Sequence, residues 1–269
     1  MTIACLLVTC CLEPSRSQIL AEVVGNLQEQ APDLGPRLTV FDNASTEVGT
    51  IDVLRDCFEQ VYQSDRNVGY WSAIDWWLRH LEADPPTYTY IIESDMIHYG
   101  FNKLQACAEY LDVNSDVGSI RLHEYSVAER HLYNKDKPRT DSRRNLWQSH
   151  TNRVTGKAVK MDHSSGDIWS TTFLTQLPAL NRFATMKEVF AELRARPRFS
   201  ELDFQELYWQ RYQRTGIVDG GIFHCNLNHY GTKSVTGSWT SESELKRLGY
   251  QTTRLASITP QDQYTVTRI

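Results

Sequence analysis

The sequence predicts an α/β fold with a mostly parallel sheet and helices on both faces. Apolar, strand-like segments alternate with helix-like segments over about the first 110 residues, as in parallel sheets joined by crossover helices. Residues 2–9 form an uninterrupted apolar run, which is typical of a strand covered on both faces. Polar residues follow each of the first four strand-like segments, where ligands bind in sheets of this kind.

The first elements follow from local patterns. After the strand at residues 2–9, residues 15–30 carry apolar side chains at helical spacing, which predicts a helix. Ser15 and Gln18 have the spacing of a capping box at its start. Residues 37–42, RLTVFD, predict the second strand.

The alternation then continues. Residues 51–60 predict a short helix, and residues 60–64 a third strand. Residues 71–81 place four apolar side chains on one helical face, and residues 87–94 predict a fourth strand. Residues 102–111 predict the next helix.

The second half carries weaker patterns. Residues 201–216 predict an amphipathic helix that is preceded by Ser200 and closed by Gly216. Ser200 and Asp203 also have the spacing of a capping box.

Composition excludes some classes of protein. The chain has 269 residues, of which 41% are hydrophobic and 23% charged, as in a soluble globular protein. Its net charge of −5 disfavours nucleic-acid binding, which normally requires a basic surface. The apolar N-terminus has no basic leader and is too short to span a bilayer.

The six cysteines show no regular framework spacing. Without a signal peptide, this favours reduced, buried thiols in a cytoplasmic protein.

Polar residues at the strand ends form the candidate site. They are Thr9 after the first strand, residues 42–46 after the second, residues 66–70 after the third and residues 93–95 after the fourth. Each could be a turn or a helix cap, but four at one sheet edge indicate a ligand site. The sequence lacks both G-x-G-x-x-G after the first strand and G-x-x-x-x-G-K-[ST], which argues against a dinucleotide fold and a P-loop.

The ordered set LLVTCC, FDNAST, RNVGYWSAIDWWL and YIIESD resembles the nucleotide-binding half of GT-A glycosyltransferases. The resemblance is to the large inverting family that includes rhamnosyl- and galactosyltransferases. It implies one domain over residues 1–269, with a nucleotide-sugar-binding half at 1–100 and a mixed acceptor-binding half at 101–269. The nucleotide-sugar-binding residues that it implies are Thr9, Asp42, Arg66, Asn67, Gly69, Ser94 and Lys233.

The resemblance also implies a divalent cation, Mn²⁺ or Mg²⁺, on the donor diphosphate. The family's D-x-D signature is here Glu93-Ser94-Asp95, and strand alternation would point both carboxylates to one side. His229 resembles a third metal ligand and Lys233 a phosphate contact, although a surface histidine in a glycine-rich loop is the alternative. Two solvated acids in a turn are the alternative for the carboxylates.

On the acceptor side, the resemblance implies that Asp203 is the catalytic base, with Glu201 as the second choice. A helix cap is the competing interpretation of Asp203. Gly166 and Asp167 resemble the floor of the acceptor pocket.

Residues 121–160 carry ten Lys/Arg and four Asp/Glu in a chain that is acidic overall. This basic segment is either a solvated insertion or a surface for an anionic acceptor or membrane face.

We therefore expect a glycosyltransferase that moves a sugar from a nucleoside-diphosphate sugar to an acceptor hydroxyl with inversion. The acceptor would be a glycan, a lipid-linked molecule or a small molecule. Two alternatives stay open: a sugar-nucleotide-forming nucleotidyltransferase, and an inactive module that binds nucleotide or sugar.

Overall fold

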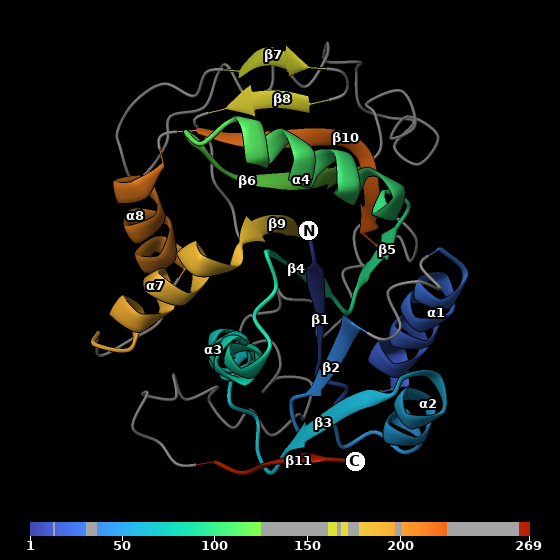
Figure 1. The fold of residues 1–269 in the computed structure, drawn as a ribbon. Helices are drawn as coiled ribbons and strands as arrows, with labels where there is room; N and C mark the ends of the chain where they lie inside the picture. The colour runs from blue at the N-terminus through green and yellow to red at the C-terminus, as the bar shows by residue number, and fades with distance from the viewer. Residues whose placement is uncertain are drawn as a thin grey trace, which may run out of the picture. The chain divides into compact units, whose positions relative to one another are not determined.

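The computed structural model describes residues 1–12, 14–30, 37–124, 161–165, 168–171, 178–196, 201–212, 214–224 and 264–269 (Figure 1). The fold is α/β, with a mixed sheet flanked by helices, as the sequence predicts. Two compact units divide the chain. We call residues 4–83, 91–98 and 223–269 the first unit, and residues 1–3, 84–90 and 99–222 the second unit.

The first three strands of the first unit form a parallel sheet, as the sequence predicts. β1 (Ile3–Thr9), β2 (Leu38–Asp42) and β3 (Gln60–Ser64) pair in the order β3-β2-β1. The C-terminal strand β11 (Val266–Arg268) adds to the outer edge of β3 in the antiparallel sense. The chain thus returns from its far end to complete the first unit.

Helices cover both faces of these strands. Figure 1 shows α1 (Pro14–Gln30) and α2 (Thr50–Cys57) on one face and α3 (Tyr70–His80) on the other. A short 3-10 helix, Leu81–Ala83, follows α3. The covered strands are apolar on both sides because neither face meets water, and the side chains of Leu6 and Val40 are fully buried.

The strand β4 (Tyr88–Glu93) crosses the division between the units, between Tyr90 and Ile91. A two-residue turn joins it to β5 (Met96–His98) in the first unit. Backbone N–H of His98 donates to Oδ1 of Asn26 on α1 at 2.7 Å, which fixes β5 to this helix.

The second unit has a mixed sheet in the order β4-β9-β6-β10-β8-β7. β6 and β10 are parallel, whereas β4–β9, β6–β9, β8–β10 and β7–β8 pair in the antiparallel sense. The strands are β6 (Val117–Glu124), β7 (Met161–Ser165), β8 (Ile168–Thr171), β9 (Ala179–Arg182) and β10 (Arg214–His224). The helices are α4 (Leu104–Val113) with a preceding 3-10 turn (Phe101–Lys103), α7 (Phe183–Leu193) and α8 (Glu201–Arg211).

Two predicted helix ends are wrong. α1 begins at Pro14, so Ser15 lies inside the helix rather than at its cap, and proline suits this first position because its missing N–H would be unbonded there anyway. α8 ends at Arg211, and Gly216 lies in β10 instead of closing the helix. A Cβ atom at Gly216 would come within 2.8 Å of the Ile120 side chain, so close strand packing explains this glycine.

Two further predictions concern the whole chain. Within the part of the chain that the structure describes, no helix has the length and apolar character needed to cross a membrane. The described cysteines are free thiols, namely Cys5, Cys10, Cys11, Cys57 and Cys107.

Candidate functional site

The carboxyl edge of the parallel strands brings two predicted positions, Thr9 and Asp42, side by side. Thr9 at the end of β1 is in register with Asp42 at the end of β2, and Asp42 is in register with Gln63 on β3. The carbonyl of Thr9 accepts a hydrogen bond from the N–H of Asn43 at 2.8 Å. Thr9 itself is buried, and its hydroxyl lies 3.6 Å from the Cys11 sulfur.

Asp42 anchors the loop that follows β2. Its carboxylate accepts hydrogen bonds from the backbone and hydroxyl of Ser45 and from Nε2 of Gln63. Burial raises the pKa of Asp42, while these hydrogen bonds oppose the rise. The residue is 0% exposed, so a hydrogen bond to a nucleotide base would require one of these partners to move.

Two asparagines tie the loops after the first three strands together. The Asn43 amide donates to Oδ1 of Asn67 at 3.0 Å, and Oδ1 of Asn43 accepts from the N–H of Val68 at 2.6 Å. Nδ2 of Asn67 lies 3.2 Å from the sulfur of Cys10, in the loop after β1. These contacts tie the loops after β1, β2 and β3 to one another.

Gly69 makes the next turn possible. Its φ of 81° and ψ of 160° fall in a region that is essentially restricted to glycine, and its N–H donates to Oδ1 of Asn67 at 2.9 Å. Arg66, two residues before Val68, has an exposed side chain and a carbonyl that accepts from the Ser64 hydroxyl at 2.7 Å. The predicted residues of this turn therefore lie at the same edge as Asp42.

The acidic triplet occupies the end of β4. Glu93 is the last residue of the strand, whereas Asp95 lies in the turn beyond it. Strand alternation therefore does not set the direction of Asp95, contrary to the prediction. Asp95 is 7% exposed, Glu93 and Ser94 are half-buried, and Oδ2 of Asp95 lies 3.4 Å from Nη1 of Arg16.

These carboxylates fit a cation that is shared with a substrate. Among the described residues, no group of three or more His, Cys, Asp and Glu side chains has metal-site geometry, and His229 and Lys233 lie outside those residues. Mg²⁺ is commonly held by one or two carboxylates together with substrate phosphates. Asp95 and Glu93 can supply that number.

The N-terminus of α3 at this edge suits a negatively charged ligand. α3 begins after Gly69, which carries no capping side chain, and its first turn has no acidic residue. α2 instead has Asp52 in its first turn, and the N–H of Thr50 donates to the carbonyl of Glu47 at 3.3 Å. The first turn of α1 contains Arg16 and no acidic residue. Helix N-termini carry partial positive charge and bind phosphate readily.

Asp203 belongs to the second unit and lies in the first turn of α8. Nη1 of Arg196, just after α7, donates to Oδ1 of Asp203 at 2.8 Å and to Oε2 of Glu206 at 3.1 Å. The Asp203 side chain is 29% exposed, so it is within reach of solvent.

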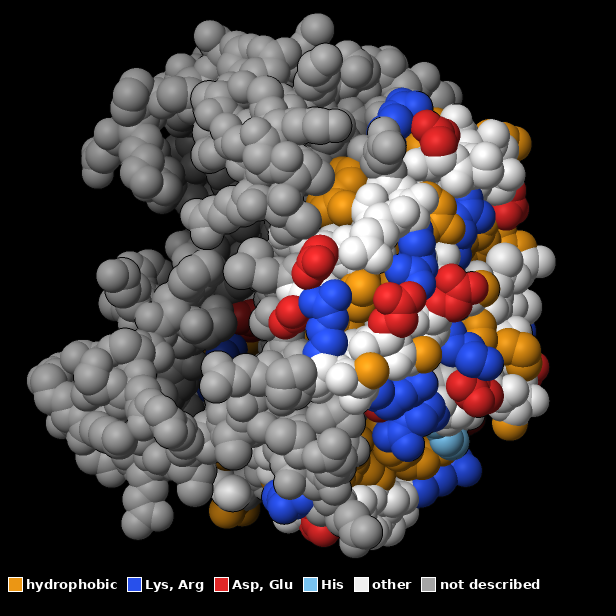
Figure 2. All heavy atoms as spheres, turned by 90° about the vertical axis from the view of Figure 1, so that its left-hand side faces the viewer, with side chains coloured by type: hydrophobic (Ala, Val, Ile, Leu, Met, Phe, Trp, Pro, Cys, Tyr) orange, Lys and Arg blue, Asp and Glu red, His pale blue; other side chains and the backbone are white. Residues whose placement is uncertain are grey.

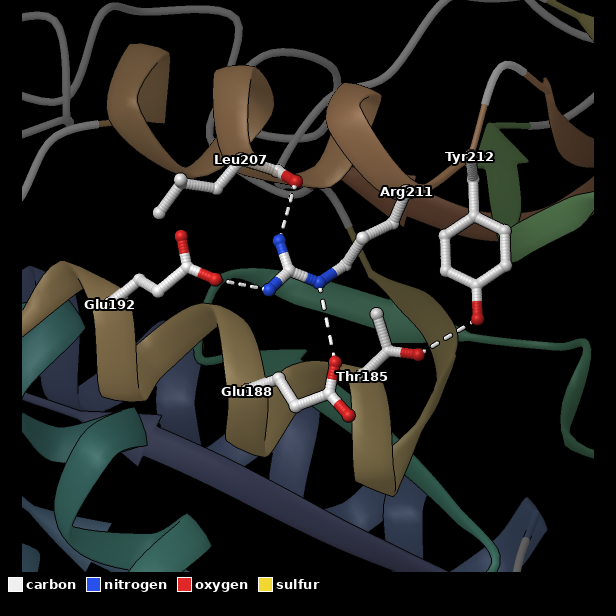
Figure 3. Close-up of polar contacts among 6 residues, drawn as sticks. All are labelled: Thr185, Glu188, Glu192, Leu207, Arg211 and Tyr212. Carbon is white, nitrogen blue, oxygen red and sulfur yellow. Dashed lines mark hydrogen bonds and ion pairs between the residues drawn. The ribbon is translucent and has the colours of Figure 1, made fainter.

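Further contacts fix α8 against α7. Figure 3 shows the guanidinium of Arg211 between Glu188 and Glu192 of α7, with Nη1 donating to the carbonyl of Leu207 at 3.0 Å. The hydroxyls of Thr185 and Tyr212 lie 2.9 Å apart in the same view. The helix that carries Asp203 is therefore held at both of its ends.

Three other predictions fall outside the described residues: Gly166, Asp167 and most of the basic segment, residues 125–160. Figure 2 shows basic and acidic side chains interspersed over the described part of the face it presents.

Sequence reasoning missed Arg16 at the carboxyl edge, and it did not identify the partners of Asn43 and Ser45. Asn43 and Ser45 were within a predicted turn, but their partners are distant in the chain. For Arg16 the available signal was a cation in the first turn of a helix, where the helix dipole disfavours it.

No protein-family model and no curated protein matches the chain. Solved structures of GT-A glycosyltransferases do match it. S. aureus TarS (residues 1–349) has a TM-score of 0.52 at 13% identity over 83% of this chain and 60% of that chain. Its complex with UDP-GlcNAc has a TM-score of 0.52 at 14% identity over 82% and 58%.

GalNAc-T7 with UDP, GalNAc and Mn²⁺ has a TM-score of 0.54 at 10% identity, over 83% of this chain and 44% of that chain. The chain thus spans 60% or less of the length of these three structures. At such low identity the likeness shows the fold alone: the chain has the GT-A fold that its motifs resemble.

Proposed function

We propose that this protein is a glycosyltransferase that moves a sugar from a nucleoside-diphosphate sugar to an acceptor hydroxyl. The observation that carries the proposal is the carboxyl edge of β1, β2 and β3 in a GT-A fold. There, Asp42 accepts hydrogen bonds from Ser45 and Gln63, and Asn67 contacts both Asn43 and Cys10. These contacts tie three loops together beside the N-terminus of α3. Ligands of open α/β sheets bind at this edge.

The proposed donor is a uridine diphosphate sugar. S. aureus TarS has been solved with UDP-GlcNAc and GalNAc-T7 with UDP, which supports this choice of nucleotide. The proposed nucleotide-sugar contacts are those implied by the resemblance: Thr9, Asp42, Arg66, Asn67, Gly69, Ser94 and Lys233.

A divalent cation on the donor diphosphate completes the proposal, with Glu93, Asp95 and His229 as its ligands. GalNAc-T7 was solved with Mn²⁺, which makes Mn²⁺ the first cation to test. When bound, the cation would stabilise the negative charge that develops on the leaving diphosphate.

We propose that Asp203 removes the proton of the acceptor hydroxyl as the sugar transfers with inversion. A positioned base contributes roughly 10²–10⁴-fold to the rate. Nη1 of Arg196 donates to Oδ1 of Asp203 at 2.8 Å, and this contact orients the carboxylate. Glu201 is the second choice, and Gly166 and Asp167 are proposed acceptor contacts.

An inactive binding module is the second candidate. It is favoured by the contact between Arg16 and Asp95, because an arginine already balances the main proposed metal ligand. Slow hydrolysis of UDP-sugar in the absence of acceptor separates the two, since only the enzyme releases free sugar.

A thermal-shift titration tests donor binding directly. UDP with Mn²⁺ should raise the melting temperature because a ligand that binds only the native state stabilises it by mass action, by about 2.7 kcal/mol at a hundred times Kd. Asp95→Asn should lose the Mn²⁺-dependent part of the shift and keep the remainder. Absence of any shift with UDP, GDP or dTDP, under Mn²⁺ or Mg²⁺, would refute the proposed function.

A further inference from the structure

The position of Arg16 is electrostatically unfavourable unless an anion lies beside it. Arg16 is in the first turn of α1, where partial positive charge of the helix N-terminus repels a cation, and no acidic side chain of that turn compensates. An anion from far along the chain lies beside it: the carboxylate of Asp95, which is 79 residues away in sequence. The two residues are therefore paired by the fold of the first unit.

The pair is partly buried but loosely joined. The side chains are 19% and 9% exposed, so solvent screens the charges only in part. Nη1 of Arg16 and Oδ2 of Asp95 are 3.4 Å apart, longer than the roughly 2.7–2.9 Å of a strong charge-assisted hydrogen bond. A competing anion with better geometry could therefore displace the carboxylate at modest cost.

Arg16 also interacts electrostatically with the two cysteines that follow β1. Burial raises the pKa of Cys10 to about 12 and raises that of Cys11, and in both cases the charge of Arg16 opposes the rise. The guanidinium is thus an electrostatic neighbour of the loop that follows Thr9 as well as of the acidic triplet.

We propose that Arg16 binds the donor diphosphate and makes cation binding depend on the nucleotide. In the donor-free protein Arg16 neutralises Asp95, which disfavours a second cation there. When a diphosphate binds, the guanidinium transfers to its oxygens, for which its planar fork is well suited, and Asp95 becomes available to a divalent cation. This inference rests on the proposed function and deepens it by naming a diphosphate-binding residue outside the D-x-D-like triplet.

Calorimetric titrations of the whole chain test separately whether Arg16 binds the diphosphate and whether it opposes cation binding. One titration uses Mn²⁺ alone and the other uses UDP alone in the presence of EDTA. In Arg16→Gln, Mn²⁺ alone should bind at least about fivefold more tightly, because the competing charge is gone. UDP alone should bind about tenfold more weakly, because a charge-assisted hydrogen bond to phosphate is lost.

Asp95→Asn should give the reverse pattern, with Mn²⁺ binding lost and metal-free UDP binding as tight as in the native protein or tighter. Arg55→Gln is the matched control, since Arg55 is an exposed arginine at the end of α2 in the same unit, and it should change neither titration. If Arg16→Gln does not fold, Arg16→Lys takes its place. The lysine keeps the charge but loses the fork, so UDP should weaken several-fold while Mn²⁺ binding stays as in the native protein.

The inference would be overturned if Arg16→Gln and Arg55→Gln changed the Mn²⁺ and UDP affinities equally. It would also be overturned if Arg16→Gln and Asp95→Asn each lost binding of both Mn²⁺ and UDP. The latter outcome would show that the pair is merely structural. If the native protein binds none of UDP, GDP and dTDP with or without Mn²⁺, the proposed function fails. The titration with Mn²⁺ alone then still decides whether Arg16 excludes cations from Asp95.

Discussion

His98 is fully buried in the first unit, and its burial has a consequence for stability against acid. Burial lowers the pKa of His98 to about 3, because a charged imidazole would lose its hydration there. In the unfolded chain a histidine titrates near pH 6.5. Above that pH both states are neutral at this site; below it the unfolded chain binds a proton that the native protein does not. The contribution of His98 to stability is therefore present above about pH 6.5 and is lost as the pH falls toward 3.

We predict that unfolding free energy falls by about 2 kcal/mol between pH 6.5 and pH 5 through His98 alone, at about 1.4 kcal/mol per pH unit. His98→Gln removes this proton uptake, so its stability should fall less steeply over the same range, even if the variant is less stable at neutral pH. Urea unfolding at several pH values measures both slopes. Parallel curves for the two proteins would contradict the prediction.

At the scale of elements, the contacts between α7 and α8 bear on the proposed role of Asp203 as the catalytic base. Arg196 contacts Asp203 at the start of α8, and Arg211 contacts two glutamates of α7 at its end (Figure 3). Exposed ion pairs of this kind typically contribute about 0–1 kcal/mol each to stability. The pairs therefore orient α8 more than they stabilise it, and orientation is what a catalytic carboxylate needs.

The variants Asp203→Asn and Arg196→Gln break the same contact from opposite sides. Both should lower unfolding free energy by less than about 1 kcal/mol, because the pair is partly exposed. If Asp203 is the base, Asp203→Asn should also reduce turnover by about 10² or more, whereas Arg196→Gln should keep most of the activity. Denaturant unfolding and a transfer or donor-hydrolysis assay on the same preparations give both quantities. Similar turnover in the two variants would move the assignment to Glu201.

At the scale of the whole chain, the last six residues complete the sheet of the first unit. β11 pairs with β3, the N–H of Ile269 donates to the carbonyl of Val61 at 2.9 Å, and the Tyr264 hydroxyl donates to the carbonyl of Ser72 at 3.3 Å. These contacts cover the outer edge of β3, which would otherwise present unpaired backbone groups.

Deletion of residues 264–269 should therefore lower unfolding free energy by about 2 kcal/mol or more, since several backbone hydrogen bonds are lost together. The uncovered β3 edge should also promote self-association. Thermal unfolding and light scattering measure the two effects. Thr267→Ala is the control, because it removes an exposed side chain of β11 and keeps the backbone; a deletion that behaves like this variant would show that β11 is dispensable.

The sequence by itself determined the first four strands, most helix positions and the class of the fold. Apolar runs and helical spacing are local signals, so they predicted β1 to β4 and α1 to α4 to within a few residues. Parallel strands end at a common edge, and this rule placed Thr9, Asp42 and Asn67 together before any contact was known. The ordered motifs also carried the resemblance to GT-A glycosyltransferases.

Only the tertiary structure decided which residues of the candidate site contact one another. Arg16 contacts Asp95 across 79 residues of sequence, and the backbone N–H of Cys11 donates to the Ser45 hydroxyl, 34 residues away, at 2.7 Å. β11 is too short and too exposed to show a strand pattern, and its partner β3 lies some 200 residues earlier. Local periodicity records which face of an element is buried but not which distant element buries it. Partner choice depends on chain topology and side-chain packing, and for this protein those contacts determine how the candidate donor site is arranged.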